Sequence, residues 1–369
     1  MASIVRSLLQ EACPRTAVRA REGSADVTSL MKIALLGPVA WRTPPLHYGP
    51  WEQITSLIAE GLVARGFDVT LFATLDSQTH AKLDGVCATG YAEQAGVDGR
   101  ISEALHVAHL LERSGEFDLI HNHLDWLPLA FARQCKAPML TTIHGFSGRG
   151  TLPAYLNARA SSFVSISDSD RAPELEYLAT VHHGVDLSVL PFSAAAGDTL
   201  VALGRIHPDK GSVDAIEIAR RAGRRLILCG IVQDERYFRE QVEPHIDGER
   251  VRFLGSVGPT QRAEILGAAA VLLHPIAFDE PFGLAVVEAM ACGTPVITYP
   301  RGSMPEIIDT GVTGFLVDGV AAAAERVDAA AALDRREIRR VAERRFSAAR
   351  MVDDYVAVYR RILAQRSHA

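Results

Sequence analysis

Cysteine, excess positive charge and long apolar runs are all scarce in this sequence, and each shortage excludes a class of protein. The five cysteines among 369 residues are far apart and form no C-x-x-C pair, which argues against a disulfide scaffold and a thiolate zinc site. The sequence has 38 Lys and Arg residues and 44 Asp and Glu residues. The resulting net charge of −6 gives no sign of a protein that binds nucleic acid or an anionic membrane. No apolar run approaches the roughly 20 residues of a transmembrane helix, and no secretion signal is seen. We therefore expect a cytoplasmic protein with reduced thiols and no nucleic-acid partner.

Two phosphate-binding motifs are absent as well. No G-x-G-x-x-G follows an expected strand, so a nicotinamide or flavin enzyme lacks its fingerprint here. No G-x-x-x-x-G-K-[ST] occurs, which disfavours a P-loop kinase or ATPase. A ligand that carries phosphates would have to be bound in another way.

The hydrophobic pattern after residue 30 is typical of two α/β halves. Short runs rich in Val, Ile and Leu alternate with helical spacing, which predicts β-α-β units and parallel sheets. Helices are expected before Gly66, over 213–222, and throughout 320–365. The expected strands are 32–36, 67–73, 118–122, 138–143 and 163–167 in the first half, and 199–203, 225–229, 251–254, 270–273 and 295–298 in the second.

The same pattern divides the chain. Residues 1–30 lack periodicity and are interpreted as a disordered leader or an over-long start. One doubly wound domain is expected over 31–190 and a second over 191–345, with a last helix over 346–369 that crosses back to the first. Such domains hold ligands in the crevice at the carboxyl ends of their strands.

The most informative segment reads EPFGLAVVEAMACG. Pro281 suits the first position of a helix, Gly283 lets a ligand approach the backbone, and Gly293 ends the helix. A helix N-terminus offers unpaired N–H groups and a positive dipole end. The backbone at Phe282, Gly283 and Leu284 is therefore a candidate cradle for a diphosphate.

Four charged side chains accompany this segment. Glu280 lies just before the expected helix and Glu288 about two turns into it, where both could flank an anion and bind sugar hydroxyls. Helix capping for Glu280 and simple solvation for Glu288 remain open. Arg205 and Lys210 follow the first strand of the second half. There the planar guanidinium of Arg205 and the ammonium of Lys210 could both reach one pyrophosphate. Two ordinary surface cations are the alternative.

Together these motifs resemble a known family. G-R-x4-K-G with E-P-F-G-L-x3-E-A-M-A-C-G-x-P-V-I is similar to the retaining nucleotide-sugar glycosyltransferases of family 4. The resemblance is strongest over about 200–320 and extends loosely to 44–52, 120–123 and 142–145. It implies the GT-B fold, in which two Rossmann-like doubly wound parallel-sheet domains face a central cleft. It also implies a hexosyltransferase that needs no metal or cofactor, with a nucleoside-diphosphate sugar as donor (UDP-glucose or GDP-mannose first) and a sugar, lipid or small molecule as acceptor.

The resemblance implies roles for residues of the second, donor-binding domain. Arg205 and Lys210 would neutralise the donor diphosphate as the glycosidic bond breaks. The backbone from Phe282 through Gly283 to Leu284 would hold the distal phosphate and the sugar. Glu280 would contact sugar hydroxyls near the reacting carbon, and Glu288 would hold the ribose.

In the first, acceptor-side domain the resemblance implies two further residues and meets one departure. His144 would project into the cleft beside the donor sugar, and Gly49 would lie in a loop near the donor phosphate and the acceptor. The family has Gly-Gly where this chain has Gly49-Pro50, and proline removes one N–H from that loop. A second departure lies in the other domain, at the strand end 228–231, where relatives often carry a second glycine two residues after the one that stands here as Gly230.

Several other motifs are given structural interpretations. Asp168 and Asp170 spell D-x-D but are expected to cap a helix rather than bind metal. His121 and His123 are expected on opposite faces of a strand, a poor geometry for a two-His metal site. His182 and His183 precede the domain junction and suggest a hinge.

Two other functions remain open. The chain could be another GT-B enzyme of sugar-nucleotide chemistry, such as an epimerase or a phosphorylase, and an absorbance scan for pyridoxal phosphate would identify a phosphorylase. It could also be a non-catalytic protein that binds a sugar nucleotide, an idea that Pro50 motivates. Turnover of a donor would exclude the non-catalytic alternative.

Overall fold

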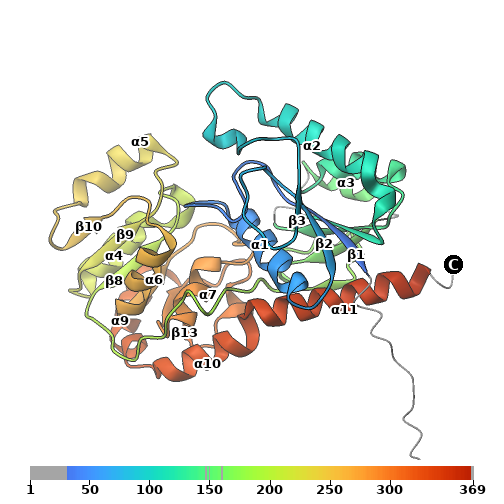
Figure 1. Ribbon diagram of the computed structural model, residues 1–369. Coiled ribbons are helices and arrows are strands. Elements are labelled where there is room, and N and C mark those ends of the chain that lie inside the picture. Colours follow the sequence, from blue (N-terminus) through green and yellow to red (C-terminus); the bar gives the residue numbers. More distant parts are fainter. Residues whose placement is uncertain (1–30, 146–147, 149, 159–160, 367–369) are drawn as a thin grey trace, which may run out of the picture.

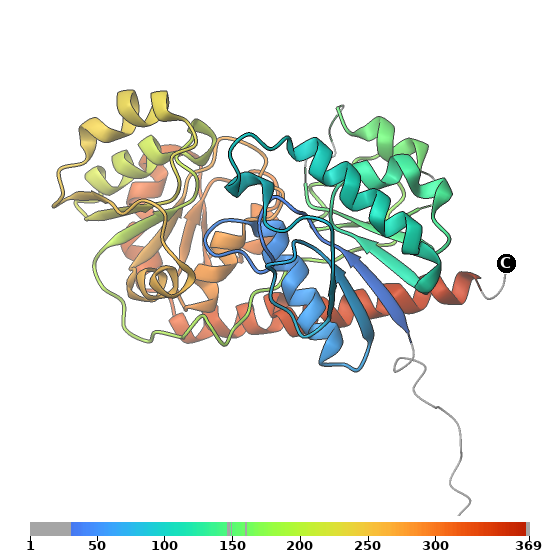
Figure 2. The same cartoon turned by 45° about the horizontal axis from the view of Figure 1, so that its top comes forward.

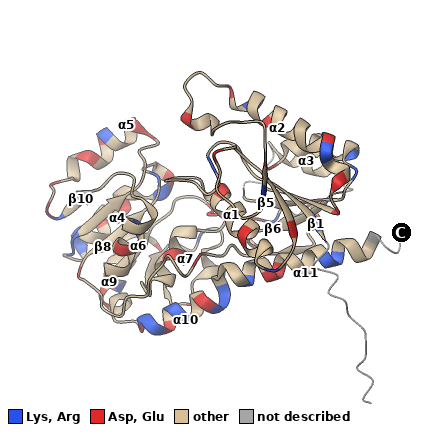
Figure 3. Ribbon diagram, in the orientation of Figure 1, with Lys and Arg blue, Asp and Glu red and all other residues tan. Residues whose placement is uncertain are grey.

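The protein is described by a computed structural model that covers residues 31–145, 148, 150–158 and 161–366. The expected leader, residues 1–30, lies outside the described residues. Figure 1 shows two α/β lobes side by side, the first half of the chain in blue and green and the second in yellow and orange. Charged residues of both signs lie mainly on the helices and loops, while the strands carry few (Figure 3).

The first lobe contains a seven-stranded parallel sheet in the order β3-β2-β1-β4-β5-β6-β7. All five expected strands are present. The sequence missed β3 and β7, which have three and two residues, are not fully buried and so lack an apolar run. The strands are β1 (Lys32–Leu36), β2 (Asp68–Phe72), β3 (Lys82–Asp84), β4 (Leu119–Asn122), β5 (Met139–Ile143), β6 (Ser162–Ser165) and β7 (Ala179–Thr180), and the helices are α1 (Pro50–Val63), α2 (Gly99–Arg113) and α3 (Leu152–Asn157).

The second lobe contains a six-stranded parallel sheet in the order β10-β9-β8-β11-β12-β13. Its five expected strands are again present, and only the three-residue β13 was missed. The strands are β8 (Leu200–Leu203), β9 (Leu226–Cys229), β10 (Val251–Phe253), β11 (Val271–His274), β12 (Val296–Thr298) and β13 (Gly314–Leu316). The helices are α4 (Ser212–Arg221), α5 (Glu235–Tyr237), α6 (Pro259–Ala268), α7 (Leu284–Ala291), α8 (Met304–Ile307), α9 (Gly319–Ala331), α10 (Arg335–Phe346) and α11 (Ala348–Arg366). No helix in this described part of the chain is long and apolar enough to cross a membrane.

Both sheets are doubly wound, and each reverses its strand order at one point. In the first sheet the reversal lies between β1 and β4, and in the second between β8 and β11. The carboxyl ends of strands at such a switch point leave a crevice for ligands. The loops after β1, β8 and β11 are therefore the expected walls of a site.

Helix α11 joins the two lobes. The stretch expected to be one continuous helix is three helices, because the chain breaks between α9 and α10 and again at Ser347. Figure 2 shows α11 running from the second lobe along the first. There Tyr355 and Tyr359 are fully buried in the core of the first sheet, and the guanidinium of Arg65, just after the end of α1, donates to Asp353 at 2.8 Å.

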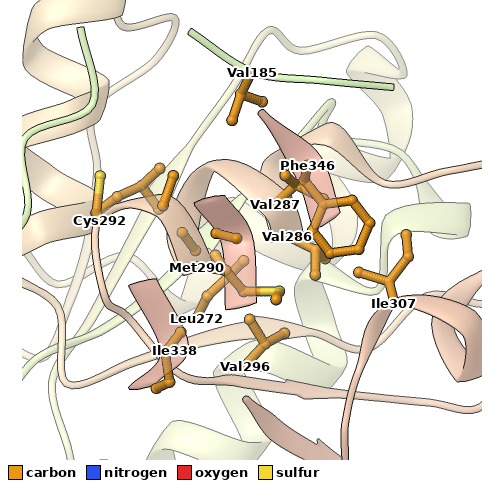
Figure 4. Close-up of a cluster of buried hydrophobic side chains, with 14 of the residues drawn as sticks. Val185, Leu272, Val286, Val287, Met290, Cys292, Val296, Ile307, Ile338 and Phe346 are labelled. Atoms are coloured by element: carbon orange, nitrogen blue, oxygen red, sulfur yellow. The ribbon is translucent and has the colours of Figure 1, made fainter. Parts of the chain in front are cut away.

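The core of the second lobe fixes α7. Val286, Val287 and Met290 on this helix are buried against Leu272 of β11 and Val296 of β12 (Figure 4). Because this face is fully covered by apolar side chains, the start of α7 is held rigidly at the end of the sheet.

Candidate active site between the two lobes

Two adjoining cavities lie between the lobes. One has a volume of about 440 Å³ and the other about 180 Å³. They share lining residues from both halves of the chain, among them Tyr48 and Pro50 from the first half and Arg205 and Leu284 from the second. The two cavities therefore form one continuous cleft with Arg205 at the junction.

The larger cavity contains a buried ion pair. The ammonium of Lys210 donates to Glu280, and the two side chains are 16% and 12% exposed. His274 Nε2 lies 3.5 Å from the same carboxylate, and Lys210 Nζ lies 4.7 Å from the centre of the Phe278 ring. Burial alone would raise the pKa of Glu280, but His274 and Lys210 outweigh it and lower the pKa to about 2. Glu280 is therefore ionised at neutral pH and held in one position.

The start of α7 differs from the sequence expectation. Pro281 is not the first helical residue, because Gly283 is the N-cap with φ 86° and the helix begins at Leu284. The preceding loop is held by Ser303, whose hydroxyl donates to Phe282 O at 3.0 Å. The first N–H groups of α7 have no acceptor within the helix and lie at the wall of the cavity, which Leu284 lines. The helix thus begins three residues later than Pro281 suggested, while Gly293, with φ 84°, ends it as predicted.

The smaller cavity contains a second carboxylate and cation. Glu288 Oε1 lies 3.2 Å from Arg262, and it is the fifth residue of α7, about one turn into the helix rather than two. Burial raises the pKa of Glu288 and the charge of Arg262 opposes the shift. Gly230 also lines this cavity, and a Cβ there would meet the carbonyl oxygen of Gly204 at 1.7 Å, so only glycine fits.

The loop with the Gly-Pro departure forms the first-half wall of the smaller cavity. Gly49 is the N-cap of α1 and Pro50 is its first residue. Proline is well suited to this position, because the N–H that it lacks would have no partner within the helix. The substitution removes one donor from the helix N-terminus and leaves those of Trp51 and Glu52.

A row of four buried histidines leads from the core to the larger cavity. His144 lines the cavity, and its Nε2 lies 2.9 Å from His123 Nδ1, whose Nε2 lies 3.3 Å from His121 Nδ1. The expectation of opposite faces for His121 and His123 was wrong, since residues two apart on an extended strand share a face. His183 Nε2 lies 3.4 Å from His144 Nδ1 and also lines the cavity, so the hinge interpretation missed a cleft residue. Burial lowers the pKa of His144 to about 3, and this ring is neutral.

The D-x-D segment and His182 join the lobes. No helix follows Asp168, so the capping interpretation was wrong. The backbone N–H groups of Asp168 and Ser169 donate to Glu306 of the second half at 2.9 and 2.7 Å, and His182 Nε2 lies 3.2 Å from the same carboxylate. Within the described ranges no group of three or more His, Cys, Asp and Glu is arranged to hold a metal ion.

The structure thus gathers all the sequence-predicted site residues around one cleft. The larger cavity is lined by His144, Arg205, Lys210, Glu280, Phe282, Gly283 and Leu284, and the smaller by Gly49, Arg205, Leu284 and Glu288. Sequence reasoning missed Trp51, Arg262 and His274. His274 ends a buried strand at a switch point, a signal that could have found it, whereas nothing in the pattern of α6 marks Arg262.

Comparison with known proteins agrees with the family resemblance of the sequence motifs. Residues 194–345 match the profile of Glycosyl transferases group 1, and residues 52–189 match Glycosyltransferase Family 4. The glycogen synthase of Mycobacterium tuberculosis (strain ATCC 25618 / H37Rv) is 28% identical over 362 residues, which cover 81% of this chain and 87% of that protein. The phosphatidyl-myo-inositol mannosyltransferase of Mycobacterium leprae is 27% identical over 343 residues, with 84% and 89% covered. AviGT4, a glycosyltransferase involved in avilamycin A biosynthesis, superposes with a TM-score of 0.70 and 25% identity over 90% of this chain and 98% of its own, and the fold is GT-B.

Proposed function

The chain belongs to the group 1 glycosyl transferases, and on this basis we propose that it moves a hexosyl group from a nucleoside-diphosphate sugar to an acceptor hydroxyl with retention of configuration. The observation that carries the proposal is the two-part cleft with Arg205 at its junction. Such a donor has a nucleoside, a diphosphate and a hexose. In the cleft, Glu288 would meet the nucleoside, Arg205 at the junction would meet the diphosphate, and Glu280 would meet the hexose.

The chemistry follows from the charges. When the bond between the hexose and the diphosphate breaks, negative charge builds on the leaving phosphate, where Arg205, Lys210 and the N-terminus of α7 would stabilise it without a metal ion. Glu280 would accept hydrogen bonds from hydroxyls of the sugar. We assign Glu280 no nucleophilic role. The acceptor hydroxyl can attack the sugar carbon on the same side from which the phosphate leaves, and the leaving phosphate can then take the proton of that hydroxyl. His144, being neutral, would contribute a hydrogen bond rather than a charge.

The two halves would divide the substrates. The second half, over 191–345, would hold the donor and the first, over 31–190, the acceptor. Two relatives are by name a glycogen synthase and a mannosyltransferase, which supports a glucosyl or a mannosyl donor. On the family resemblance, UDP-glucose and GDP-mannose are the donors to test first. A cytoplasmic location stays a prediction.

A thermal-shift panel of nucleotide sugars tests the proposal. A ligand at 100 times its Kd adds about 2.7 kcal/mol to the free energy of unfolding, which gives a clear rise in Tm. The expected result is stabilisation by one nucleotide sugar and its nucleoside diphosphate, but not by the free hexose 1-phosphate. NMR of the product's anomeric proton then reports retention or inversion. Absence of stabilisation by every nucleotide sugar, together with absence of turnover, would contradict the proposal.

A further inference from the structure

A third cavity, of about 240 Å³, lies in the first lobe. Its walls combine aromatic rings with carboxylates. The chain has three tryptophans, and all three line this one cavity. Trp126 is 42% exposed, so its indole is not there to fill the hydrophobic core. The residues that define the cavity here are Trp41, Trp51, Trp126, Glu52, Glu103 and Asp125.

One side chain separates this cavity from the donor cleft. Trp51 lines both the third cavity and the larger cavity of the cleft. Its ring stacks on His144, with ring centres 5.3 Å apart and an angle of 21° between the planes. A molecule bound against the far side of Trp51 would therefore lie next to the proposed position of the donor sugar, as an acceptor must.

The charge of the third cavity is of one sign. Its lining includes three carboxylates, and none of its lining residues is Lys, Arg or His. Glu52 is 3% exposed and accepts the N–H of Trp41 at 3.2 Å, while Glu103 accepts the hydroxyl of Tyr91 at 2.9 Å. A carboxylate can accept about four hydrogen bonds, so these groups retain capacity for a ligand's hydroxyls. Their negative charges, which Glu52 carries fully only above its pKa of about 7, repel a phosphate.

We propose that the third cavity is an acceptor subsite for one uncharged sugar ring and that it rejects phosphorylated acceptors. The indoles offer flat apolar faces to the C–H face of the ring, and Glu52, Glu103 and Asp125 accept its hydroxyls. The volume is below the roughly 300–1,000 Å³ of pockets for drug-sized ligands, which fits a single ring. The inference rests on the proposed glycosyltransferase function.

Tryptophan fluorescence tests the subsite directly, because every indole of the chain reports on it. The full chain is titrated with glucose, mannose and glucose 6-phosphate, and the same compounds are offered as acceptors with the donor that is turned over. The expected result is a saturable change in emission and transfer with a neutral sugar, and neither with the sugar phosphate.

Two variants locate the effect. Trp126→Ala, at a partly exposed position, should raise the KM for the sugar acceptor roughly tenfold or more while the KM for the donor stays unchanged. Ile101→Ala truncates a 61% exposed side chain of α2 outside the cavity and is the matched control. An unchanged acceptor KM in Trp126→Ala, or equal use of glucose and glucose 6-phosphate, would overturn the inference.

The test also separates this inference from the proposed function. If no nucleotide sugar binds or is hydrolysed, the glycosyltransferase proposal fails and the subsite falls with it. If a donor is bound and slowly hydrolysed but no neutral sugar changes the emission or accepts transfer, the subsite alone is refuted.

Discussion

Two buried glutamates, Glu280 in the wall of the cleft and Glu52 in the adjoining third cavity, lie in opposite environments. Glu280, from the second lobe, touches Lys210 and His274, and these partners lower its pKa to about 2 against the effect of burial. Glu52, from α1 of the first lobe, forms no ion pair with any described residue, and burial raises its pKa to about 7 against the hydrogen bond from Trp41. Burial is common to both residues. A positive partner within contact distance decides the sign of the shift.

This difference extends to the walls as a whole. The second lobe presents Arg205, Lys210 and Arg262 and the start of α7, which suits a diphosphate. The first lobe presents neutral imidazoles, such as His144, and indoles. The proposed function assigns an anion to the second wall and an uncharged partner to the first, and the following variants test that division.

The largest effect is expected from Lys210→Met. Loss of a group that stabilises the leaving phosphate should lower kcat by about 10²–10³-fold or more. The variant also leaves Glu280 buried without its partner, which costs about 3–5 kcal/mol. The double variant Lys210→Met/Glu280→Gln removes that stability cost, so turnover and urea unfolding measured on both variants separate catalysis from folding.

The control is Lys82→Met, which breaks the exposed ion pair with Asp68 in the first lobe. It should leave turnover and stability nearly unchanged, because exposed pairs contribute about 0–1 kcal/mol. Near-normal turnover in the double variant would contradict the role of the second wall.

The next effect is a pH dependence of opposite sign at the two glutamates. The folded pKa of Glu52 is about 7 against an ordinary value of 4.5, so the folded state binds the extra proton and loses stability as the pH rises from about 4.5 to 7. Glu52→Gln should therefore be more stable than the parent at pH 8, by on the order of 3 kcal/mol, and equal to it near pH 4.

Glu280 should behave in the reverse way. Its folded pKa of about 2 lies below the ordinary value of 4.5, so its contribution is complete above about pH 4.5 and fades as the pH falls toward 2. Glu280→Gln should be less stable than the parent at pH 6–8, with a gap that narrows toward pH 3. Urea unfolding at several pH values measures the free energy of unfolding of both variants. If both differ from the parent in the same direction at pH 8, the two glutamates do not have opposite environments.

A smaller effect is expected at His144. Because the ring is neutral and offers hydrogen bonds only, His144→Ala should lower kcat about threefold to tenfold. The ratio of variant to parent kcat should stay constant from pH 5 to 8, since the pKa of about 3 lies outside this range. A ratio that changes between pH 6 and 7 would show that His144 acts as a cation.

The smallest effect is expected from Pro50→Gly, which restores the family's Gly-Gly pair. Pro50 occupies the first position of α1, where its missing N–H has no helical acceptor, so the KM for the donor should change less than about threefold. A larger gain in donor affinity would mean that the first wall also binds the diphosphate.

Most of the fold could be predicted from the hydrophobic periodicity and the glycine positions of the sequence. Ten strands could be predicted because each lies in a short apolar run of the sequence, whereas β3, β7 and β13 have two or three residues, and no such run marks them. The start of α7 could not be placed, because Pro281 fits a first helical position by its own chemistry and the positive φ of Gly283 depends on the packed loop.

Site residues could be predicted from the sequence only where several of them belong to one recognisable motif. Lys210 and Glu280 are 70 residues apart, and their contact depends on the loops after β8 and β11 meeting at one switch point. The histidine row required the faces of β4 and β5, and Arg262 on α6 reaches Glu288 only through the packing of α6 against α7.

Calorimetric titration of the purified chain with UDP-glucose and GDP-mannose tests the division of the walls most directly, with Arg205→Gln compared against Glu52→Gln. Charge-assisted hydrogen bonds contribute about 1.5–3 kcal/mol, so the Kd of the bound donor should rise at least about tenfold in Arg205→Gln. In Glu52→Gln it should stay within about twofold of the parent value. Equal Kd values in the parent and Arg205→Gln, or a larger loss in Glu52→Gln, would contradict a donor site built on the second lobe.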